Sequence, residues 1–111
     1  TESERRFRAV FDESPNALLL SETPEIRFVD VNSAATAFFG FTREELLGRN
    51  GLELNVWVDL ERRNELLLEY RAGRELTERE VAFRRKDGTT FPALLSTRRL
   101  SLGGRGYILF S

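Results

Sequence analysis

The stretch at residues 28–49, with the sequence FVDVNSAATAFFGFTREELLGR, constrains the fold most strongly, because a strand ends there and capped helices follow. Val29 and Val31 stand two residues apart, which is the spacing of side chains on one face of a strand. Asn32 then offers the side-chain oxygen that a helix N-terminus needs for its free N–H groups. Gly40 suits the left-handed residue at which a short helix ends. The stretch therefore predicts a strand that leads straight into a short helix.

A second short helix follows with its own start and stop signals. Thr42 and Glu45 form a T-x-x-E capping box, in which each side chain satisfies a backbone N–H of the other residue. Phe41 precedes this cap and is placed to meet Leu46 as a hydrophobic staple. Gly48 then provides a residue at which the helix can stop.

Two further helices are predicted from apolar residues at helical spacing. Phe7, Val10 and Phe11 lie at positions i, i+3 and i+4, which makes residues 2–12 an amphipathic helix. Asp59 is a suitable N-cap for a longer helix at residues 59–72. On that helix Leu60, Leu67 and Leu68 fall near one face, flanked by Leu66 and Tyr70.

The remaining apolar segments predict five antiparallel strands, at residues 17–21, 26–31, 77–83, 91–100 and 106–110. Pro24 marks a turn between the first two. Asp87 with Gly88, and later Gly103 with Gly104, mark the turns between the last three, because these residues tolerate positive φ. Strands and helices that are segregated along the chain indicate an α+β fold.

These phrases, taken in order, resemble the middle of a PAS domain: V-N, S-A-A, F-F-G-F-T and E-E-L-L-G-R. An E-S-P-x-A phrase at residues 13–17 resembles the one that commonly precedes the first strand in that family. The resemblance covers residues 7–111 and implies the PAS fold, a five-stranded antiparallel sheet of order 2-1-5-4-3 with short helices across one face around a small cavity. We expect residues 1–13 to form an N-terminal flanking helix and residues 14–111 to form the domain.

Composition excludes several kinds of site. The 111 residues contain no Cys and no His, which excludes disulfides, thiolate nucleophiles and Cys/His zinc sites within this segment. Lys and Arg number 17 against 18 Asp and Glu, so no positive excess favours nucleic acid as a partner. No apolar run approaches the ~20 residues that cross a bilayer, so we expect no membrane insertion.

Cofactor chemistry is restricted in the same way. Gly48, Arg49 and Asn50 resemble the start of the motif in the flavin-binding light-oxygen-voltage branch of the PAS family, where a photoreactive Cys comes next. Gly51 stands at that position here, so no cysteinyl–flavin adduct is possible. A haem held by an axial His is excluded as well. The identity of any cofactor stays unknown.

Candidate residues for lining the cavity of such a fold come mainly from aromatic positions: Asn32, Phe38, Phe39, Phe41, Trp57, Phe83, Leu95 and Phe110. Each has a simpler interpretation, since Asn32 is needed as an N-cap and aromatic residues at this spacing commonly fill a core.

A basic cluster is formed by Arg84, Arg85 and Lys86, with Arg98 and Arg99 expected across the hairpin. It could bind an anion or a partner. Basic residues on a solvated face of the sheet are the simpler explanation, and we prefer it.

The resemblance implies a sensory PAS domain cut from a larger cytoplasmic signalling protein, such as a sensor histidine kinase of a two-component system or a diguanylate cyclase. Such a domain has no catalysis of its own and acts by a population shift that a small ligand or partner biases. We expect a homodimer through Phe7, Val10 and Phe11, with an output domain in the same chain. The alternative is a purely structural dimerisation module with a filled core and no ligand.

Overall fold

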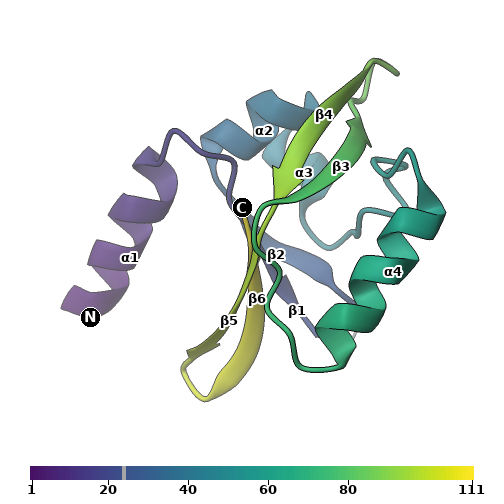
Figure 1. Ribbon diagram of the computed structural model, residues 1–111. Coiled ribbons are helices and arrows are strands. Elements are labelled where there is room, and N and C mark those ends of the chain that lie inside the picture. Colours follow the sequence, from purple (N-terminus) through teal and green to yellow (C-terminus); the bar gives the residue numbers. More distant parts are fainter. Residues whose placement is uncertain (24) are drawn as a thin grey trace.

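The computed structural model describes residues 1–23 and 25–111 (Figure 1). Pro24, for which the sequence predicts a turn, lies outside the described residues. The elements follow in the order α1 (Glu2–Glu13), β1 (Leu19–Glu22), β2 (Arg27–Val31), α2 (Ser33–Phe39), α3 (Arg43–Leu46), α4 (Leu60–Arg71), β3 (Arg79–Arg84), β4 (Thr90–Leu95), β5 (Thr97–Leu102) and β6 (Arg105–Phe110). Helices α1 and α4 lie on opposite sides of the sheet, and α2 packs into the same core as α4.

The strands form a four-stranded antiparallel sheet of order β2-β1-β6-β5 and a separate antiparallel pair, β3-β4. The expected order 2-1-5-4-3 is recovered when β4 and β5 are taken as one strand divided at Ser96. At that point Ser96 exchanges two backbone hydrogen bonds with Ser111, at 2.9 and 3.0 Å. The predicted continuous strand at residues 91–100 is therefore wrong in one respect, because β4 leaves the main sheet to pair with β3.

Local capping chemistry accounts for the two short helices. Asn32 Oδ1 accepts a hydrogen bond from Ala35 N at 2.9 Å and so caps α2. The capping box of α3 is complete: Thr42 Oγ1 accepts from Glu45 N at 3.1 Å, and Glu45 Oε1 accepts from Thr42 N at 2.9 Å. Gly40 has φ 78°, a left-handed conformation that ends α2. These predictions from the sequence are confirmed.

The hydrophobic core lies between the helices and the inner face of the sheet, which we define as the face towards α2 and α4. It consists of buried side chains from both layers: Leu19, Phe28, Val31, Ala35, Phe39, Leu46, Val56, Leu66, Leu76, Val81, Phe83 and Leu95. Each fully buried side chain of this size contributes about 1.5–3 kcal/mol relative to exposure.

Helix α1 is attached at its C-terminal half. Phe11 is 1% exposed, and Arg8 Nη2 donates to Asp30 Oδ2 at 2.5 Å, while Arg43 Nη2 donates to the other oxygen at 3.1 Å. Burial raises the pKa of Asp30, but the two guanidinium groups outweigh burial and hold that pKa below its ordinary value. Val10 is 71% exposed, so the expected stripe is divided between a buried residue and one in solvent.

Within residues 1–23 and 25–111, none of the helices combines the length and the apolar character needed to cross a membrane.

Candidate functional site

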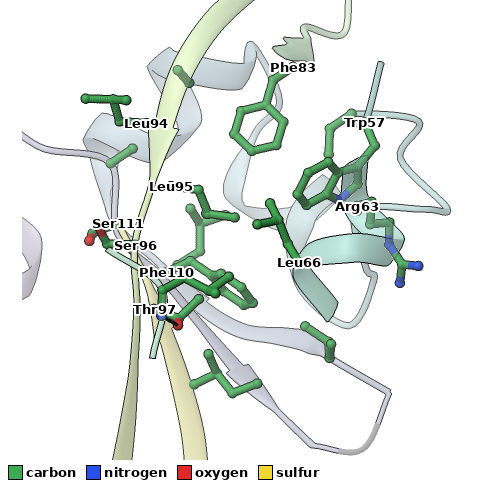
Figure 2. A pocket seen from close by; sticks show the side chains of 18 of the residues that line it. Trp57, Arg63, Leu66, Phe83, Leu94, Leu95, Ser96, Thr97, Phe110 and Ser111 are labelled. Carbon is green, nitrogen blue, oxygen red and sulfur yellow. Dashed lines mark hydrogen bonds between the residues drawn. The ribbon is translucent and has the colours of Figure 1, made fainter. Parts of the chain in front are cut away.

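A cavity of about 600 Å³ lies between the inner face of the sheet and the helices. Its lining comes from β1, β2, β6, α2, α4 and the β3–β4 hairpin, and most of it is apolar. Figure 2 shows Leu66, Phe83, Leu95 and Phe110 directed towards a common centre from four different elements. This volume falls within the roughly 300–1,000 Å³ range of sites that hold small organic molecules.

Aromatic rings form one wall of the cavity. Phe39 meets Phe83 edge to face, with centroids 5.3 Å apart, and Trp57 meets Phe83 in the same manner at 5.0 Å. The wall exists because α2 turns Phe39 inwards, β3 places Phe83 on the inner face, and Trp57 forms an isolated β-bridge to Phe83. Edge-to-face pairs add about 0.5–1.5 kcal/mol beyond burial, so the wall is held in place without a ligand.

The floor of the cavity contains polar side chains whose acceptors are already used. Thr97 Oγ1 accepts from Leu76 N at 3.0 Å, and Thr97 N donates to Leu76 O at 2.9 Å. Ser96 Oγ accepts from Glu78 N at 2.9 Å. These hydroxyl groups therefore serve to tie the segment after α4 to the sheet.

Two polar side chains of the lining with unused donors come from α4 and the loop before it. Asn50 Oδ1 accepts from Glu53 N at 2.9 Å, which leaves the amide NH₂ of Asn50 for another partner. Arg63 donates only to Asn64 Oδ1, at 3.3 Å, and forms no salt bridge within the described part of the chain. Burial, and after it the charge of Arg71, lowers the pKa of Arg63.

The structure places Phe38, Phe39, Trp57, Phe83, Leu95 and Phe110 in the lining of the cavity. Asn32 and Phe41, also expected there, lie outside it, beside a shallow groove near α1. The side chain of Asn32 already makes four hydrogen bonds within the protein. Its Oδ1 accepts from Leu18 N and Ala35 N, and its Nδ2 donates to Phe11 O and Asn16 O. Ligand binding by the six lining residues stays a prediction.

The expected basic cluster does not form one surface. Register pairs Arg84 with Thr90, whereas Arg98 pairs with Leu109 in the other sheet. Arg85 lies over the Phe91 ring at 4.0 Å, and Lys86 Nζ donates to Glu45 at 2.6 Å. Arg98 and Arg99 are therefore not cross-strand neighbours of residues 84–86, which corrects the sequence-based expectation.

Helix α4 contributes cavity residues that the sequence analysis missed, namely Arg63, Leu66, Leu67 and Tyr70. Their spacing of three and four residues is the signal that could have identified them. The sequence instead grouped Leu60, Leu67 and Leu68 near one face, but Leu60 and Leu68 are 54% and 69% exposed, while the flanking Leu66 is 2% exposed.

Gly51 closes one side of the cavity against Trp57. A Cβ atom at Gly51 would lie 2.9 Å from Trp57 Nε1 and 3.2 Å from Val56 Cγ2. The indole therefore occupies the space that a side chain at this position would need. No group of three or more Asp or Glu side chains is gathered for a metal ion in the residues that the structure describes.

Comparison with known proteins gives a consistent result. A family model described as "PAS domain" matches residues 15–111. The methyl sulfide methyltransferase-associated sensor of Methanosarcina acetivorans is 30% identical over 107 residues, which are 94% of this chain and 10% of that sensor. The chain thus spans about a tenth of the length of this relative.

Solved structures share the fold. The light-oxygen-voltage protein of Rhodobacter sphaeroides is 27% identical with a TM-score of 0.80, and the match covers 100% of this chain and 66% of that one. A PAS domain from a two-component sensor histidine kinase is 23% identical with a TM-score of 0.77, covering 98% of this chain and 94% of that one. The family match, the α+β architecture and the cavity beneath the helices agree, and the chain belongs to the PAS domain family.

Proposed function

We propose that this chain is the sensory PAS domain of a larger cytoplasmic signalling protein, of the histidine kinase or diguanylate cyclase type. The domain binds a small, mostly apolar molecule and has no catalytic activity of its own. The observation that carries the proposal is the cavity of about 600 Å³, lined mainly by aromatic and aliphatic side chains from both layers. The similarity to the sensor from Methanosarcina acetivorans and to a PAS domain from a sensor histidine kinase supports the signalling context.

The proposed signal is a shift between two arrangements of sheet and helices. A ligand in the cavity touches α4 through Leu66 and the end of β6 through Phe110, so it favours whichever arrangement brings these elements closest. A ligand can shift the equilibrium only through its difference in affinity for the two arrangements.

Flavin photochemistry through a cysteine adduct is not part of this proposal. Gly51 carries no thiol, and the adjacent Trp57 fills the space where a side chain would extend. The cavity is instead proposed for a reversibly bound ligand.

Self-association through α1 is proposed as the second property of the domain. Val10 is 71% exposed, whereas Phe11 is buried and Phe7 stacks on Phe11. The exposed Val10 also favours the alternative function, a dimerisation module without a ligand. Ligand binding separates the two functions.

The test is the binding of Nile red, a neutral apolar dye that fluoresces in apolar cavities. Ala93 is half-buried and lines the cavity, so Ala93→Trp should fill it and abolish dye binding. Thr90→Trp is the matched control, because Thr90 is exposed on the same strand and does not line the cavity. Absence of dye binding, or binding that survives Ala93→Trp, would favour the module without a ligand.

A further inference from the structure

The cavity contains one cationic side chain and no carboxylate placed to neutralise it. Arg63, from the first turns of α4, lines the cavity, and in the described residues neither Asp nor Glu forms a salt bridge with it. Glu78 is the one acidic residue of the lining, and it is exposed to solvent. Arg63 therefore differs from Arg62 beside it, which donates to Glu65 and to the backbone oxygen of Glu80.

The position of Arg63 suits a charged group at the edge of an apolar site. Figure 2 shows its guanidinium turned away from Leu95 and Phe110, towards the outside of the cavity. An arginine of this kind keeps its aliphatic stem along the apolar wall and its charge near water. A ligand group that meets the guanidinium would thus lie at the mouth, while the rest of the ligand fills the interior.

Two other residues of the lining, Asn50 and Trp57, can donate hydrogen bonds to a ligand. Asn50 offers its amide NH₂, since its oxygen is bonded to Glu53 N. Trp57 also lines the cavity, and its indole has only an N–H to offer. In Figure 2, Trp57 and Arg63 are drawn at the same edge of the cavity. Donors with a net positive charge select an acceptor with negative charge.

We propose that the cavity selects an apolar molecule that ends in a single carboxylate, with Arg63 binding the carboxylate at the mouth and the hydrocarbon body lying against Leu66, Phe83 and Phe110. This inference rests on the proposed sensory function and names its ligand class. One guanidinium matches one carboxylate in bidentate geometry. The apolar remainder of the lining has no partner for a second charge.

The burial of Arg63 agrees with this assignment. Burial and the neighbouring Arg71 lower its pKa, so the guanidinium lacks compensation for the solvation that it has lost. An incoming carboxylate would supply that compensation. Because the group is half-buried, added salt should weaken the interaction only in part.

The experiment compares three probes that share one hydrocarbon chain: dodecanoate, 1-dodecanol and dodecylamine. Displacement of Nile red from the full chain measures each affinity. We expect dodecanoate to bind at least about tenfold more tightly than dodecanol, as a hydrogen bond between charged groups predicts, and the protonated amine to bind most weakly.

Substitutions of Arg63 test whether this residue causes the preference for dodecanoate over dodecanol. Arg63→Gln should remove the difference between dodecanoate and dodecanol, chiefly because dodecanoate binds more weakly. Arg63→Lys should retain part of the difference, because it keeps the charge and loses the bidentate geometry. Arg74→Gln is the matched control, since Arg74 is exposed just after the same helix, does not line the cavity and does not affect the pKa of Arg63.

The outcomes separate this inference from the proposed function. Equal binding of dodecanoate and dodecanol, or a preference that survives Arg63→Gln, overturns the carboxylate assignment and leaves the cavity as a binding site. If no probe and no dye binds, the proposed sensory function fails as well. A preference lost in Arg63→Gln and kept in Arg74→Gln supports the assignment.

Discussion

Asn32 connects three parts of the chain through one side chain. Its oxygen accepts from Leu18 N and Ala35 N, and its NH₂ donates to Phe11 O and Asn16 O. At 1% exposure, none of these bonds can be replaced by bulk water. Asn32 thus joins the end of α1, the segment before β1 and the start of α2.

Replacing Asn32 should be costly for this reason. Asn32→Ala leaves several buried backbone groups without partners, at about 1–3 kcal/mol each, so we expect the free energy of unfolding to fall by about 3 kcal/mol or more. Asn32→Asp keeps the acceptor for α2 but places an acceptor against Phe11 O and Asn16 O, and should loosen α1 selectively. Urea unfolding measures the first effect, and amide exchange in α1 measures the second. If Asn32→Ala has the same free energy of unfolding as the wild-type protein, Asn32 does not have this connecting role.

At the scale of elements, α3 is joined to the β3–β4 hairpin by one carboxylate. Glu45 completes the capping box and also accepts from Lys86 Nζ at 2.6 Å. The hydrogen bond from Lys86, and then the one from the backbone N–H of Thr42, lower the pKa of Glu45 from 4.5 to about 2. A lowered pKa means that the charged form is favoured in the folded state.

The consequence is a specific pH dependence. The stability that Glu45 contributes is fully present above the ordinary pKa of 4.5 and is lost as the pH falls towards about 2. We expect Glu45→Gln to destabilise the protein near neutral pH and to converge with the unchanged protein in acid, as measured by urea unfolding against pH. Glu44→Gln, in the same helical turn, is the control. Parallel curves for the Glu45 variant and the unchanged protein would show that the carboxylate does not act in this way.

Helix α1 is the element that packs on the rest of the domain along only part of its apolar face. It has 12 residues, a length at which isolated helices are marginal in water, and its anchors are Phe11 and the Arg8–Asp30 pair. Val10 is left largely in solvent. A second copy related by a two-fold axis would cover both Val10 side chains at once.

We expect the domain to sediment as a dimer that Val10→Glu weakens. Val10 does not support the fold of the monomer, so this variant tests association better than removal of α1, which would also remove the buried Phe11. Ala9→Glu is the matched control, because it places the same charge on an exposed neighbouring position. A monomer before substitution, or equal weakening by both variants, would rule out α1 as the interface.

Helix caps could be predicted from the sequence because their chemistry is local. Asn32 and Thr42 bond to residues three positions away, and both predictions are confirmed. The break at Ser96 could not be predicted, because its partners Glu78 and Ser111 are distant in sequence.

The orientation of α4 escaped prediction for a similar reason. Arg79 binds Glu69 through two hydrogen bonds, at 2.7 and 2.8 Å, and Arg62 Nε donates to Glu80 O at 3.1 Å. These contacts join α4 to β3, with Leu66 buried and Leu68 in solvent. Five aromatic residues of the lining were predictable from the sequence, but Phe41 was wrongly included, and Tyr70 and Arg63 depended on this tertiary arrangement.

For the whole molecule, the central claim is that a preformed cavity between sheet and helices is the sensory site. In the lining, the hydroxyl groups of Ser96 and Thr97 are bonded to the backbone, while Arg63 and Asn50 keep donors free. A ligand would therefore meet an apolar interior with hydrogen-bond donors at its edge. Because the cavity is already present, a ligand could bind without repacking of the core side chains.

Native mass spectrometry of the freshly purified protein tests this claim most directly. The account predicts a bound small molecule that adds a discrete mass, is released on denaturation and is absent from Ala93→Trp but present in Thr90→Trp. Negative-ion analysis of the released molecule should show a carboxylic acid. A mass equal to that of the chain alone, together with no uptake of dodecanoate or dodecanol, would contradict the account and leave a filled dimerisation module.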